Sequence, residues 1–401
     1  MTRRTAIIGG GAAGFFLAIH LKELMPEMDV TIFEWSKRVL AKVAVSGGGR
    51  CNCTNTFEEV RDLSEVYPRG HRLLKRLFKS FDHNDAFRRF ESHGVPLTVQ
   101  DDHCVFPTAQ DAHAIIDCFL RECQRYGIHL HTQHRIDDLS QLDGYDYVAV
   151  TTGGSQRTDS FEWLRCEGHE IVAPVPSLFS ISIGDRSLQS LMGAVAPNAV
   201  VQIPGTRLRA KGPLLITHWG LSGPAILKLS SHAARLLHDC SYRTTIHVNW
   251  TGQNDNDTRE ELSRLAVNRM KLLSSTPPSG LTQRLWNYLL AKHLKNKSGA
   301  RWCDAGNKDV NKMVDALCND PVETTGRAPF RDEFVTCGGV SLKSINPSTL
   351  ESRTRPNLYF AGEVLDIDGV TGGFNFQAAW TTAFVVAESI ALKAKSVIHN
   401  S

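Results

Sequence analysis

The feature that most constrains the fold of this chain is the run Gly9–Gly14, which fits the pattern GxGxxG and follows a short apolar segment. Each of its three pattern glycines has a separate physical task. We expect Gly9 to allow a tight turn out of a strand, and Gly11 to leave room for a pyrophosphate beside the backbone. Gly14 is expected to let a helix pack closely on that strand. The run therefore predicts a loop that binds a dinucleotide.

The residues on either side predict the strand and the helix that such a loop requires. Residues 5–8 are typical of a short buried strand, and residues 12–25 are typical of a helix. The first N–H groups of this helix, at Ala12 and Ala13, can hold phosphate oxygens because the N-terminal end of a helix carries partial positive charge. This context predicts a Rossmann-type α/β fold.

An acidic residue follows at the position expected for ribose recognition. Residues 30–33 predict a second strand, which ends at Glu34, 20 residues after Gly14. A carboxylate there accepts hydrogen bonds from a ribose diol, and its charge disfavours a 2′-phosphate. The sequence therefore disfavours NADP in this slot.

Length and composition are those of an ordinary globular protein. With 401 residues, 42% of them hydrophobic, the chain can bury a large core in two or three domains. The net charge of +3 is nearly balanced, and we take the charges to be dispersed, which does not indicate nucleic acid as a partner. No stretch approaches about 18 uncharged apolar residues, so no membrane span is expected.

Ten cysteines are scattered without a repeating spacing, which favours a reducing cytoplasm over a disulfide framework. Only Cys51 and Cys53 lie close together in sequence, and neither a second pair nor a nearby histidine completes a zinc site. We therefore expect no metal. A reactive Cys51 is an alternative, but a buried structural thiol is the favoured interpretation.

The chain divides into stretches of different sequence pattern. Up to residue 170, helices and strands alternate, which predicts a parallel α/β sheet, and this pattern returns from about 331 to 401. Between them, residues 171–330 contain short apolar runs broken by Gly and Pro, followed by a helix-rich segment at about 252–320. We predict a nucleotide-binding domain built from residues 1–170 and 331–401, with residues 171–330 inserted as an antiparallel β unit.

A second glycine pair, Gly372 and Gly373, precedes a predicted helix that begins near Phe374. A flavin ring far from the first glycine loop needs a backbone that can approach it closely, and glycines provide one. The helix would direct its positive end toward the N1–C2=O edge and stabilise reduced flavin by about 0.3–1 kcal/mol. An ordinary helix N-cap is the alternative. Asp366 can bond to ribityl hydroxyls or the pyrophosphate region, or be a solvated acid.

Longer motifs resemble one flavoprotein family. Ser46–Asn55 reads Ser-Gly-Gly-Gly-Arg-Cys-Asn-Cys-Thr-Asn and Gly362–Asp366 reads Gly-Glu-Val-Leu-Asp, and both are specific to that family rather than to Rossmann folds in general. The chain resembles the HI0933-like or YhiN-like flavoproteins, which include aminoacetone oxidase-like members and a bile-acid ene-reductase. The other matching stretches are Gly9–Gly14, Lys42–Val45, Val105–Pro107, Gly168–Pro176, Thr217–Pro224 and Thr336–Gln377.

The resemblance implies an FAD-binding fold with an inserted antiparallel β-barrel-like unit and a small helical cap, and flavin-dependent oxidoreductase activity. Matched residue by residue, the implied FAD contacts are Gly9, Gly11, Gly14, Glu34, Arg50, Gly362, Asp366, Gly372, Gly373, Phe374 and Asn375. We also assign to the cofactor Ala12, Ala13, Thr152, Gly153 and Glu363. Lys42 bonds to phosphate, lies near the flavin or is a surface lysine. The backbone of Ile136, in the strand after Ile128, is expected to contact the adenine.

One loop departs from the family pattern. After Thr152-Gly153-Gly154 the family usually continues through a longer glycine-rich loop, whereas here Ser155–Ser160 leads directly to Phe161. A shortened loop beside the cofactor affects flavin retention or the shape of the access route. It gives weight to the alternative of a non-catalytic flavin-binding or redox-sensing protein.

No second GxGxxG occurs, so the sequence predicts no dedicated nicotinamide domain. NADH or NADPH is then expected only as a transient reductant, and the leading hypothesis is hydride transfer through flavin N5 to or from a small organic substrate. His218 is a candidate for proton transfer, although a structural histidine is favoured. An RNA-modifying flavoenzyme is disfavoured because no basic stretch with interleaved aromatic residues occurs. The sequence leaves the substrate and the oligomeric state open.

Overall fold

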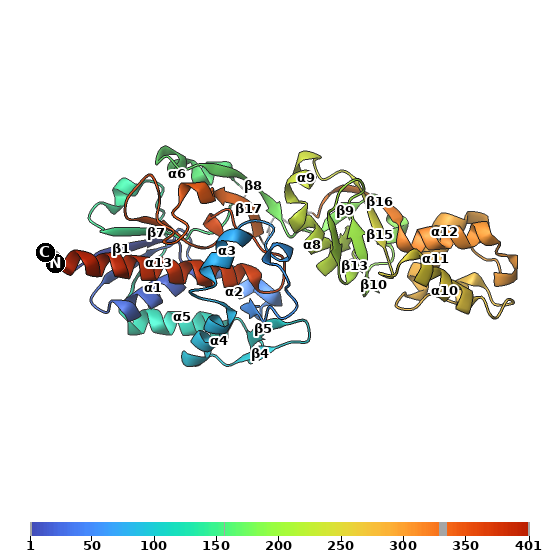
Figure 1. Cartoon of the computed structure of the whole chain (residues 1–401), viewed down its shortest axis with the longest axis horizontal. Coiled ribbons are helices and arrows are strands. Elements are labelled where there is room, and N and C mark those ends of the chain that lie inside the picture. Colours follow the sequence, from blue (N-terminus) through green and yellow to red (C-terminus); the bar gives the residue numbers. More distant parts are fainter. Residues whose placement is uncertain (1, 156, 329–334, 400–401) are drawn as a thin grey trace. The chain divides into compact units, whose positions relative to one another are not determined.

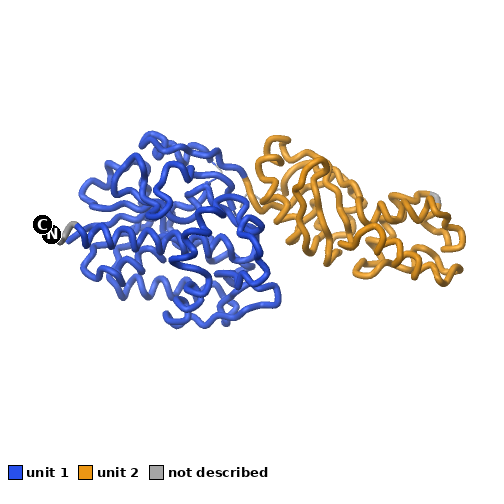
Figure 2. The backbone as a smooth tube through the Cα atoms, in the orientation of Figure 1, with its two compact units in different colours: residues 1–175, 335–401 blue, residues 176–334 orange. Residues whose placement is uncertain are grey.

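The computed structural model describes residues 2–155, 157–328 and 335–399. It divides into two compact units, which Figure 2 shows in different colours. Unit 1 comprises residues 1–175 and 335–401, and unit 2 comprises residues 176–334. Each unit has its own sheet and its own buried apolar core.

Unit 1 is built on a five-stranded parallel sheet with the order β18-β7-β1-β2-β6 (Figure 1). Its strands are β1 (Arg4–Ile8), β2 (Asp29–Phe33), β6 (His129–His131), β7 (Tyr147–Val150) and β18 (Leu358–Phe360). Because β18 pairs directly with β7, both ends of the chain contribute to one sheet. The predicted Rossmann-type parallel α/β sheet is confirmed.

Two helices that begin at glycine motifs pack side by side in unit 1. These are α1 (Ala12–Leu24), which follows β1, and the C-terminal helix α13 (Phe374–His399), as Figure 1 shows. Phe16 of α1 stacks on Trp380 of α13 with ring centroids 5.5 Å apart, and both side chains are buried. Burial of these rings fixes the two helices against each other, since each buried aromatic side chain contributes a large apolar area.

The other elements of unit 1 surround this sheet. The helices are α2 (Ala41–Val45), α3 (His71–Leu77), α4 (His83–Ser92), α5 (His113–Arg125) and α6 (Glu162–Cys166). A small antiparallel sheet contains β3 (Thr54–Asn55), β5 (Cys104–Pro107) and β4 (Leu97–Val99) in that order. Where the chain leaves for unit 2 and returns, β8 (Ile171–Ser177) pairs with β17 (Val335–Val340).

Unit 2 contains an eight-stranded antiparallel sheet with the order β10-β13-β14-β9-β16-β15-β11-β12. The strands are β9 (Ile181–Ile183), β10 (Val195–Ala196), β11 (Val200–Gln202), β12 (Arg209–Lys211), β13 (Leu214–Ile216), β14 (Gly220–Ser222), β15 (Thr245–Asn249) and β16 (Asp320–Arg327). The predicted antiparallel unit is confirmed.

The expected barrel-like closure is not found. Within the described part of unit 2, no ladder joins the edge strands β10 and β12, so the sheet remains open. Closure requires strands long enough to tilt and stagger around an axis. The two edge strands are only 2 and 3 residues long, which leaves little backbone to form a closing ladder.

The helices of unit 2 are α7 (Arg186–Gln189), α8 (Pro224–His232), α9 (Ala234–Asp239), α10 (Asp255–Leu265), α11 (Gln283–Leu294) and α12 (Asn307–Cys318). The last three form a helical lobe at one end of the unit (Figure 1) and lie within the segment predicted to be rich in helices. Trp250, Trp286 and Trp302 are buried in the core of unit 2.

Over the described residues, no helix combines the length and apolar character that a membrane crossing needs. In the same residues, no three or more His, Cys, Asp or Glu side chains are grouped so as to hold a metal ion.

Candidate functional site

The first glycine loop connects β1 to α1, and two of its glycines are required by the protein's own packing. Gly9 has φ +114°, and a Cβ placed on it would lie 2.5 Å from the carbonyl oxygen of Thr151. A Cβ on Gly14 would lie 2.0 Å from the carbonyl oxygen of Gly9. Both distances are far below van der Waals contact, so the tight turn and the close approach of helix to strand depend on glycine, as the sequence indicated.

Gly11 is different, because its surroundings are open. A Cβ at this position would meet no protein atom within 4 Å. Gly11 is also the N-cap of α1 and, as a glycine, supplies no capping side chain to the first N–H groups of that helix. The open approach and the uncapped helix start fit a phosphate group, which helix N-termini bind through N–H bonds and the helix dipole. This part of unit 1 therefore fits the pyrophosphate of a dinucleotide.

Glu34 lies at the end of β2 with its carboxylate held in place by backbone donors. The side chain is buried, Oε2 accepts from the N–H of Gly10 at 2.8 Å, and Oε1 accepts from the N–H of Ser36 at 2.8 Å. Each carboxylate oxygen has a further lone pair for a ligand hydroxyl. The geometry fits the predicted recognition of a ribose diol beside the glycine loop.

The placement of Ile136 in a strand is wrong. β6 ends at His131, and Ile136 follows in an irregular segment, with its side chain buried. The segment nevertheless continues beside the end of β2, because the N–H of Glu34 donates to His131 at 2.8 Å and the N–H of His134 donates to Glu34 at 2.9 Å. Only three residues of β6 pair with β2, so the strand ends at His131, before the chain reaches Ile136.

The second glycine signature has a buried interior. The side chains of Cys51 and Cys53 are fully buried, and loss of hydration raises the pKa of the Cys51 thiol to about 12. A thiol with such a pKa is almost entirely protonated at neutral pH and is a poor nucleophile. Cys53 donates from Sγ to the carbonyl oxygen of Val105. The structure thus confirms buried structural thiols rather than a reactive cysteine.

The second signature and the start of α13 are in direct contact, although more than three hundred residues separate them in the chain. Asn55 Nδ2 donates to the carbonyl oxygen of Gly372 at 3.1 Å, and Thr54 Oγ1 donates to Gln377 Oε1 at 2.6 Å. Gly373 has φ +89°, and a Cβ on it would lie 2.2 Å from the carbonyl oxygen of Thr54. Gly373 therefore allows the two motifs to meet.

A third cluster forms around Glu363. Its Oε2 pairs with Lys42 Nζ at 2.7 Å, and its Oε1 accepts from the N–H of Thr336 at 2.8 Å. A Cβ on Gly154 would lie 2.7 Å from Glu363 Oε1, and Gly153 has φ +75°. Lys42, a residue of α2, is thus half exposed and bound to the carboxylate of Glu363. This carboxylate lies beside the turn that Thr152 and Gly153 begin after β7.

Gly362 completes the contact between the C-terminal turn and the glycine loop. It has φ +78°, and a Cβ on it would lie 2.9 Å from the Cβ of Ala13. Its N–H donates to Thr382 Oγ1 at 2.9 Å. The turn after β18 therefore lies against the first turn of α1.

The shortened loop that follows Gly154 includes Gln156, which lies outside the described residues, and the chain then enters α6.

The remaining predicted contacts have partners within the protein. The Arg50 guanidinium lies 4.3 Å from the ring centroid of Phe106, and Nε donates to Gly47. Phe374 is buried, and its carbonyl oxygen accepts from the hydroxyl of Tyr67 at 2.8 Å. Asn375 bonds through both side-chain atoms to the backbone of Gly369, and the N–H of Asp366 donates to Val340. The contacts of Asp366, Phe374 and Asn375 fix the loop before α13 and the start of that helix.

His218 belongs to unit 2 and not to this cluster of motifs. It is exposed in the turn between β13 and β14, and its ring packs edge-on against Trp219 at 4.3 Å. Hydrogen bonds between Thr217 and Gly220 close the turn beneath it. The sequence correctly placed this histidine at a strand end.

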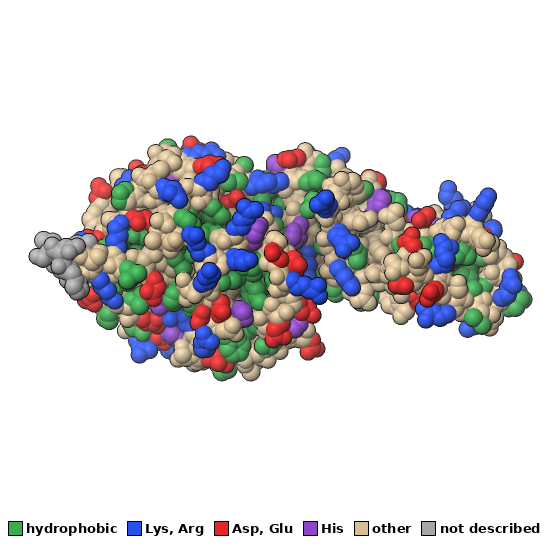
Figure 3. Space-filling model, in the orientation of Figure 1, with side chains coloured by type: hydrophobic (Ala, Val, Ile, Leu, Met, Phe, Trp, Pro, Cys, Tyr) green, Lys and Arg blue, Asp and Glu red, His purple; other side chains and the backbone are tan. Residues whose placement is uncertain are grey.

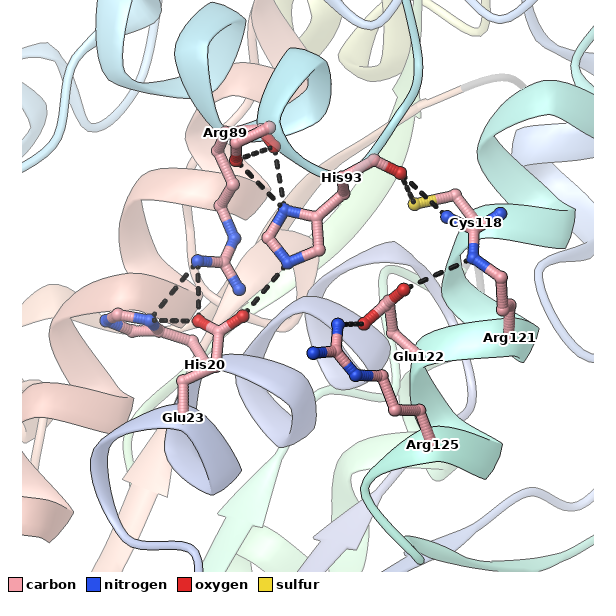
Figure 4. A network of polar contacts seen from close by, with 9 residues as sticks. His20, Glu23, Arg89, His93, Cys118, Arg121, Glu122 and Arg125 are labelled. Atoms are coloured by element: carbon pink, nitrogen blue, oxygen red, sulfur yellow. Dashed lines mark hydrogen bonds and ion pairs between the residues drawn. The ribbon is translucent and has the colours of Figure 1, made fainter.

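Sequence reasoning missed an ionic network between α1 and α4, drawn in Figure 4. Glu23 contacts Arg89 Nη1 at 2.8 Å, His93 Nε2 at 2.9 Å and His20 Nδ1 at 3.2 Å. Burial alone raises the pKa of Glu23, but bonds with both histidines and with Arg89 lower it well below its ordinary value. Helical spacing of His20 with Glu23 and of Arg89 with His93 is visible in the sequence, but which helices face each other is not.

This chain is similar to known proteins over nearly its whole length. The model of the HI0933-like protein Rossmann domain matches residues 3–389. A ribosomal RNA dihydrouridine synthase of Haemophilus influenzae is 27% identical, covering 96% of this chain and 97% of its own. The 3-dehydro-bile acid delta(4,6)-reductase of Clostridium scindens is 25% identical, covering 97% and 99%. A ribosomal RNA dihydrouridine synthase of Escherichia coli is 26% identical, covering 97% and 98%.

Solved structures of flavoproteins are similar over most of the chain. An open flavocytochrome c3 fumarate reductase covers 98% of this chain and 78% of its own, with 15% identity and a TM-score of 0.47. The 3-ketosteroid delta1-dehydrogenase from Sterolibacterium denitrificans covers 98% and 100%, with 11% identity and a TM-score of 0.49.

Proposed function

This chain belongs to the HI0933-like family and is an FAD-dependent oxidoreductase, and from that premise we propose that it reduces a carbon–carbon double bond conjugated to a carbonyl group. The observation that carries the proposal is the chemistry shared by the relatives' names. Dihydrouridine differs from uridine by two hydrogens added across the ring double bond next to a carbonyl. A 3-dehydro-bile acid delta(4,6)-reductase acts on ring double bonds that are conjugated to a 3-oxo group.

The residues of unit 1 fit the cofactor that such a reaction needs. Gly11, Ala12 and Ala13 would hold the pyrophosphate, Gly9 and Gly14 shape the loop, and Glu34 would hold the adenosine ribose. When bound, FAD supplies hydride transfer at N5. The contacts proposed for the rest of the cofactor are Lys42, Arg50, Ile136, Thr152, Gly153, Gly362, Glu363, Asp366, Gly372, Gly373, Phe374 and Asn375.

The chain's own contribution to the redox step is the start of α13. This helix is 26 residues long, and its first residue, Phe374, follows a glycine pair with positive φ. A helix N-terminus stabilises developing negative charge by about 0.3–1 kcal/mol when exposed, and more when water is excluded. We propose that it favours the reduced, anionic flavin. The hydrogen bonds from Asn55 and Thr54 would keep this terminus in place.

The proposed proton donor is His218, because histidine is the side chain most often used for general acid catalysis. His218→Ala is expected to leave flavin reduction unchanged and to slow substrate reduction by about 100-fold. His238→Ala, in an exposed histidine of the same unit, is the matched control. Equal turnover of both variants and the wild type would remove His218 from the mechanism.

The proposal covers two classes of substrate. A small enone is one, with NADH or NADPH as a transient reductant. The other is a uracil base in RNA. Two relatives are ribosomal RNA dihydrouridine synthases, so the expectation that nucleic acid is not a partner of this chain is not supported. The alternative of a non-catalytic flavin protein is not retained, because the family is one of oxidoreductases.

The test is anaerobic reoxidation of the reduced holoprotein. Flavin reduced by NADH, NADPH or dithionite is mixed with cyclohexenone, a 3-oxo-4-ene steroid, uridine or an oligouridylate, and the visible flavin band is followed. At least one unsaturated compound should reoxidise the flavin and gain two hydrogens by mass spectrometry, whereas the saturated analogue should not. The proposal fails if none reoxidises it faster than buffer, or if the protein neither carries nor takes up FAD.

A further inference from the structure

The charge of this chain is divided unequally between its two compact units. Unit 1 has 25 Lys and Arg against 29 Asp and Glu, whereas unit 2 has 20 against 13. The near-balanced total therefore hides an acidic unit and a basic one. The expected dispersal of charge therefore describes the chain as a whole and not its two units. Charge asymmetry between parts of a chain indicates a polyanionic partner for the basic part.

The helical lobe contributes part of this excess, and most of its cations lie in one stretch. Between Leu262 and Cys303 there are eight Lys and Arg and no Asp or Glu. This stretch runs from the end of α10 through α11 to the turn before α12. Figure 3 shows Lys and Arg side chains on the visible face of the lobe, with acidic side chains beside them.

Backbone pairing brings its cations together. Two segments of the lobe form a short antiparallel bridge between Leu272 and Arg301. Beside it, the N–H of Cys303 donates to Arg269 at 2.9 Å and the N–H of Trp302 donates to Lys271 at 3.1 Å. Arg269, Lys271 and Arg301 are therefore neighbours on one surface, although more than thirty residues of chain separate the first from the last. All three side chains are exposed.

Buried tryptophans hold this surface rigid from below. Trp302 Nε1 donates to Thr276 Oγ1 at 2.9 Å, and Trp286 Nε1 donates to the carbonyl oxygen of Leu273 at 2.8 Å. Both rings are buried in the core of unit 2. A surface that is already ordered loses less conformational entropy when it binds a partner.

Among the described residues, the side chains of Arg269, Lys271 and Arg301 form no ion pair with a carboxylate, and apolar side chains lie between them. The carboxylate of the nearby Asp304 accepts from the backbone N–H of Arg301 and not from its guanidinium. Met270 is 62% exposed and Leu272 is 44% exposed. Large exposed apolar side chains in a basic setting are typical of a binding surface. We call these five residues the basic lobe surface.

We propose that the basic lobe surface docks RNA, with its cations on phosphates and Met270 and Leu272 against the faces of unstacked bases. Charge complementarity selects a polyanion, and the alternating apolar side chains favour a strand with accessible bases over a double helix, whose bases are stacked inside. The inference rests on the proposed reduction of a conjugated double bond, for which a uracil base in RNA is one of the two substrate classes.

The first experiment measures binding without turnover. The oxidised holoprotein is titrated into a fluorescein-labelled oligouridylate of about 16 nucleotides, and the anisotropy is followed over a range of salt concentrations. The triple variant Arg269→Gln, Lys271→Gln, Arg301→Gln should bind at least about tenfold more weakly at moderate salt. The slope of log K against log salt should fall by about 2, since each lost phosphate contact on a single strand removes about 0.7.

A matched control removes the same charge from the other unit. Arg72→Gln, Lys75→Gln, Lys79→Gln changes three exposed cations on and beside α3 of unit 1 and should bind like the wild type. Equal weakening by both triples would overturn the proposal, because net charge alone would then explain binding. Absence of wild-type binding, or binding to phosphatidylserine vesicles but not to the oligouridylate, would also overturn it.

A second variant separates the apolar contacts from the charges. Met270→Ser should weaken binding severalfold and leave the salt slope unchanged, because no charge is removed. An unchanged affinity would overturn the role given to this side chain. Turnover of cyclohexenone by the surface triple should equal that of the wild type. If the wild type reduces no conjugated double bond but the triple loses RNA binding, the docking surface stands and the proposed reaction fails.

Discussion

The two units of this protein differ in the features that mark them in the sequence, and we propose a different ligand for each. In unit 1, glycines permit approaches that a single Cβ would forbid, as at Gly14 and Gly373, where the distances to backbone oxygens would be 2.0 and 2.2 Å. In unit 2, the distinctive feature is an excess of cations on a lobe braced by tryptophans. A cofactor site depends on individual positions, whereas a charged docking surface depends on the composition of a region whose limits must be known.

The largest effect is expected at Gly14 in unit 1. Gly14→Ala places a Cβ against the backbone oxygen of Gly9, so either α1 moves away from β1 or the loop unfolds. We expect a loss of more than about 4 kcal/mol in the free energy of unfolding, together with loss of FAD. Denaturant titration followed by circular dichroism measures it. A loss below about 1 kcal/mol would show that the close packing is not needed.

In unit 2 the most sensitive group is a buried carboxylate rather than a glycine. Asp320 is fully buried and binds Lys292 Nζ at 2.7 Å, His293 Nε2 at 2.8 Å and Trp250 Nε1 at 3.1 Å. Asp320→Asn should cost about 3 kcal/mol, since it removes the charge that Lys292 and His293 face. Asp239→Asn, at an exposed carboxylate, should cost less than about 0.5 kcal/mol.

The Asp320→Asn variant also tests whether FAD binding depends on the stability of unit 2. Asp320→Asn should lower thermal stability but leave the affinity for FAD unchanged, because the proposed cofactor contacts lie in unit 1. Isothermal titration of the apoprotein with FAD, below the melting temperature, checks this. A matching loss of FAD affinity would mean that cofactor binding depends on unit 2 as well.

A smaller and pH-dependent effect is expected from the network around Glu23. Glu23→Gln should cost about 2 kcal/mol near pH 6, because Arg89, His20 and His93 lose their shared carboxylate. Its bond with Glu23 raises the pKa of His93. The stability gained from His93 is therefore complete below its unfolded value of about 6.5 and is lost as pH rises through the raised folded value.

The lowered pKa of Glu23 acts in the opposite direction. Its contribution is complete above the unfolded value of about 4.5 and is lost as pH falls further. The difference in melting temperature between the wild type and His93→Gln should therefore be widest between about pH 4.5 and 6.5 and should narrow toward pH 9. Glu27→Gln, at an exposed acid four residues after Glu23, is the control. A pH-independent difference would contradict the assignment.

The smallest effect on stability is expected at Gly11. Because a Cβ there meets no protein atom within 4 Å, Gly11→Ala should change the free energy of unfolding of the apoprotein by less than about 1 kcal/mol. It should nevertheless weaken FAD binding at least about tenfold, because the methyl group would occupy the approach to the pyrophosphate. Unchanged FAD affinity would mean that the phosphate binds elsewhere.

Much of unit 1 could be predicted from the sequence because its signals are local. Gly9, Gly14 and Glu34 occur at spacings set by the strand, turn and helix that they shape, and the structure places them accordingly. Ile136 was assigned to a strand because apolar periodicity does not mark where pairing stops. The open sheet of unit 2 was expected to close for a related reason, since closure depends on edge pairing and not on the pattern within each strand.

By itself the sequence determined the glycine loop and the acid at the end of β2 in the proposed cofactor region, because glycine, a terminal acid and a helix start act through bonds and clashes with nearby elements. Only the tertiary structure decided which distant segments share a surface. It joined Thr54 to Gly373, placed Glu23 of α1 against Arg89 of α4, and set Arg269 beside Arg301. The physical reason is that packing and hydrogen bonding across the chain depend on how whole elements are arranged, and residue spacing carries no record of that arrangement.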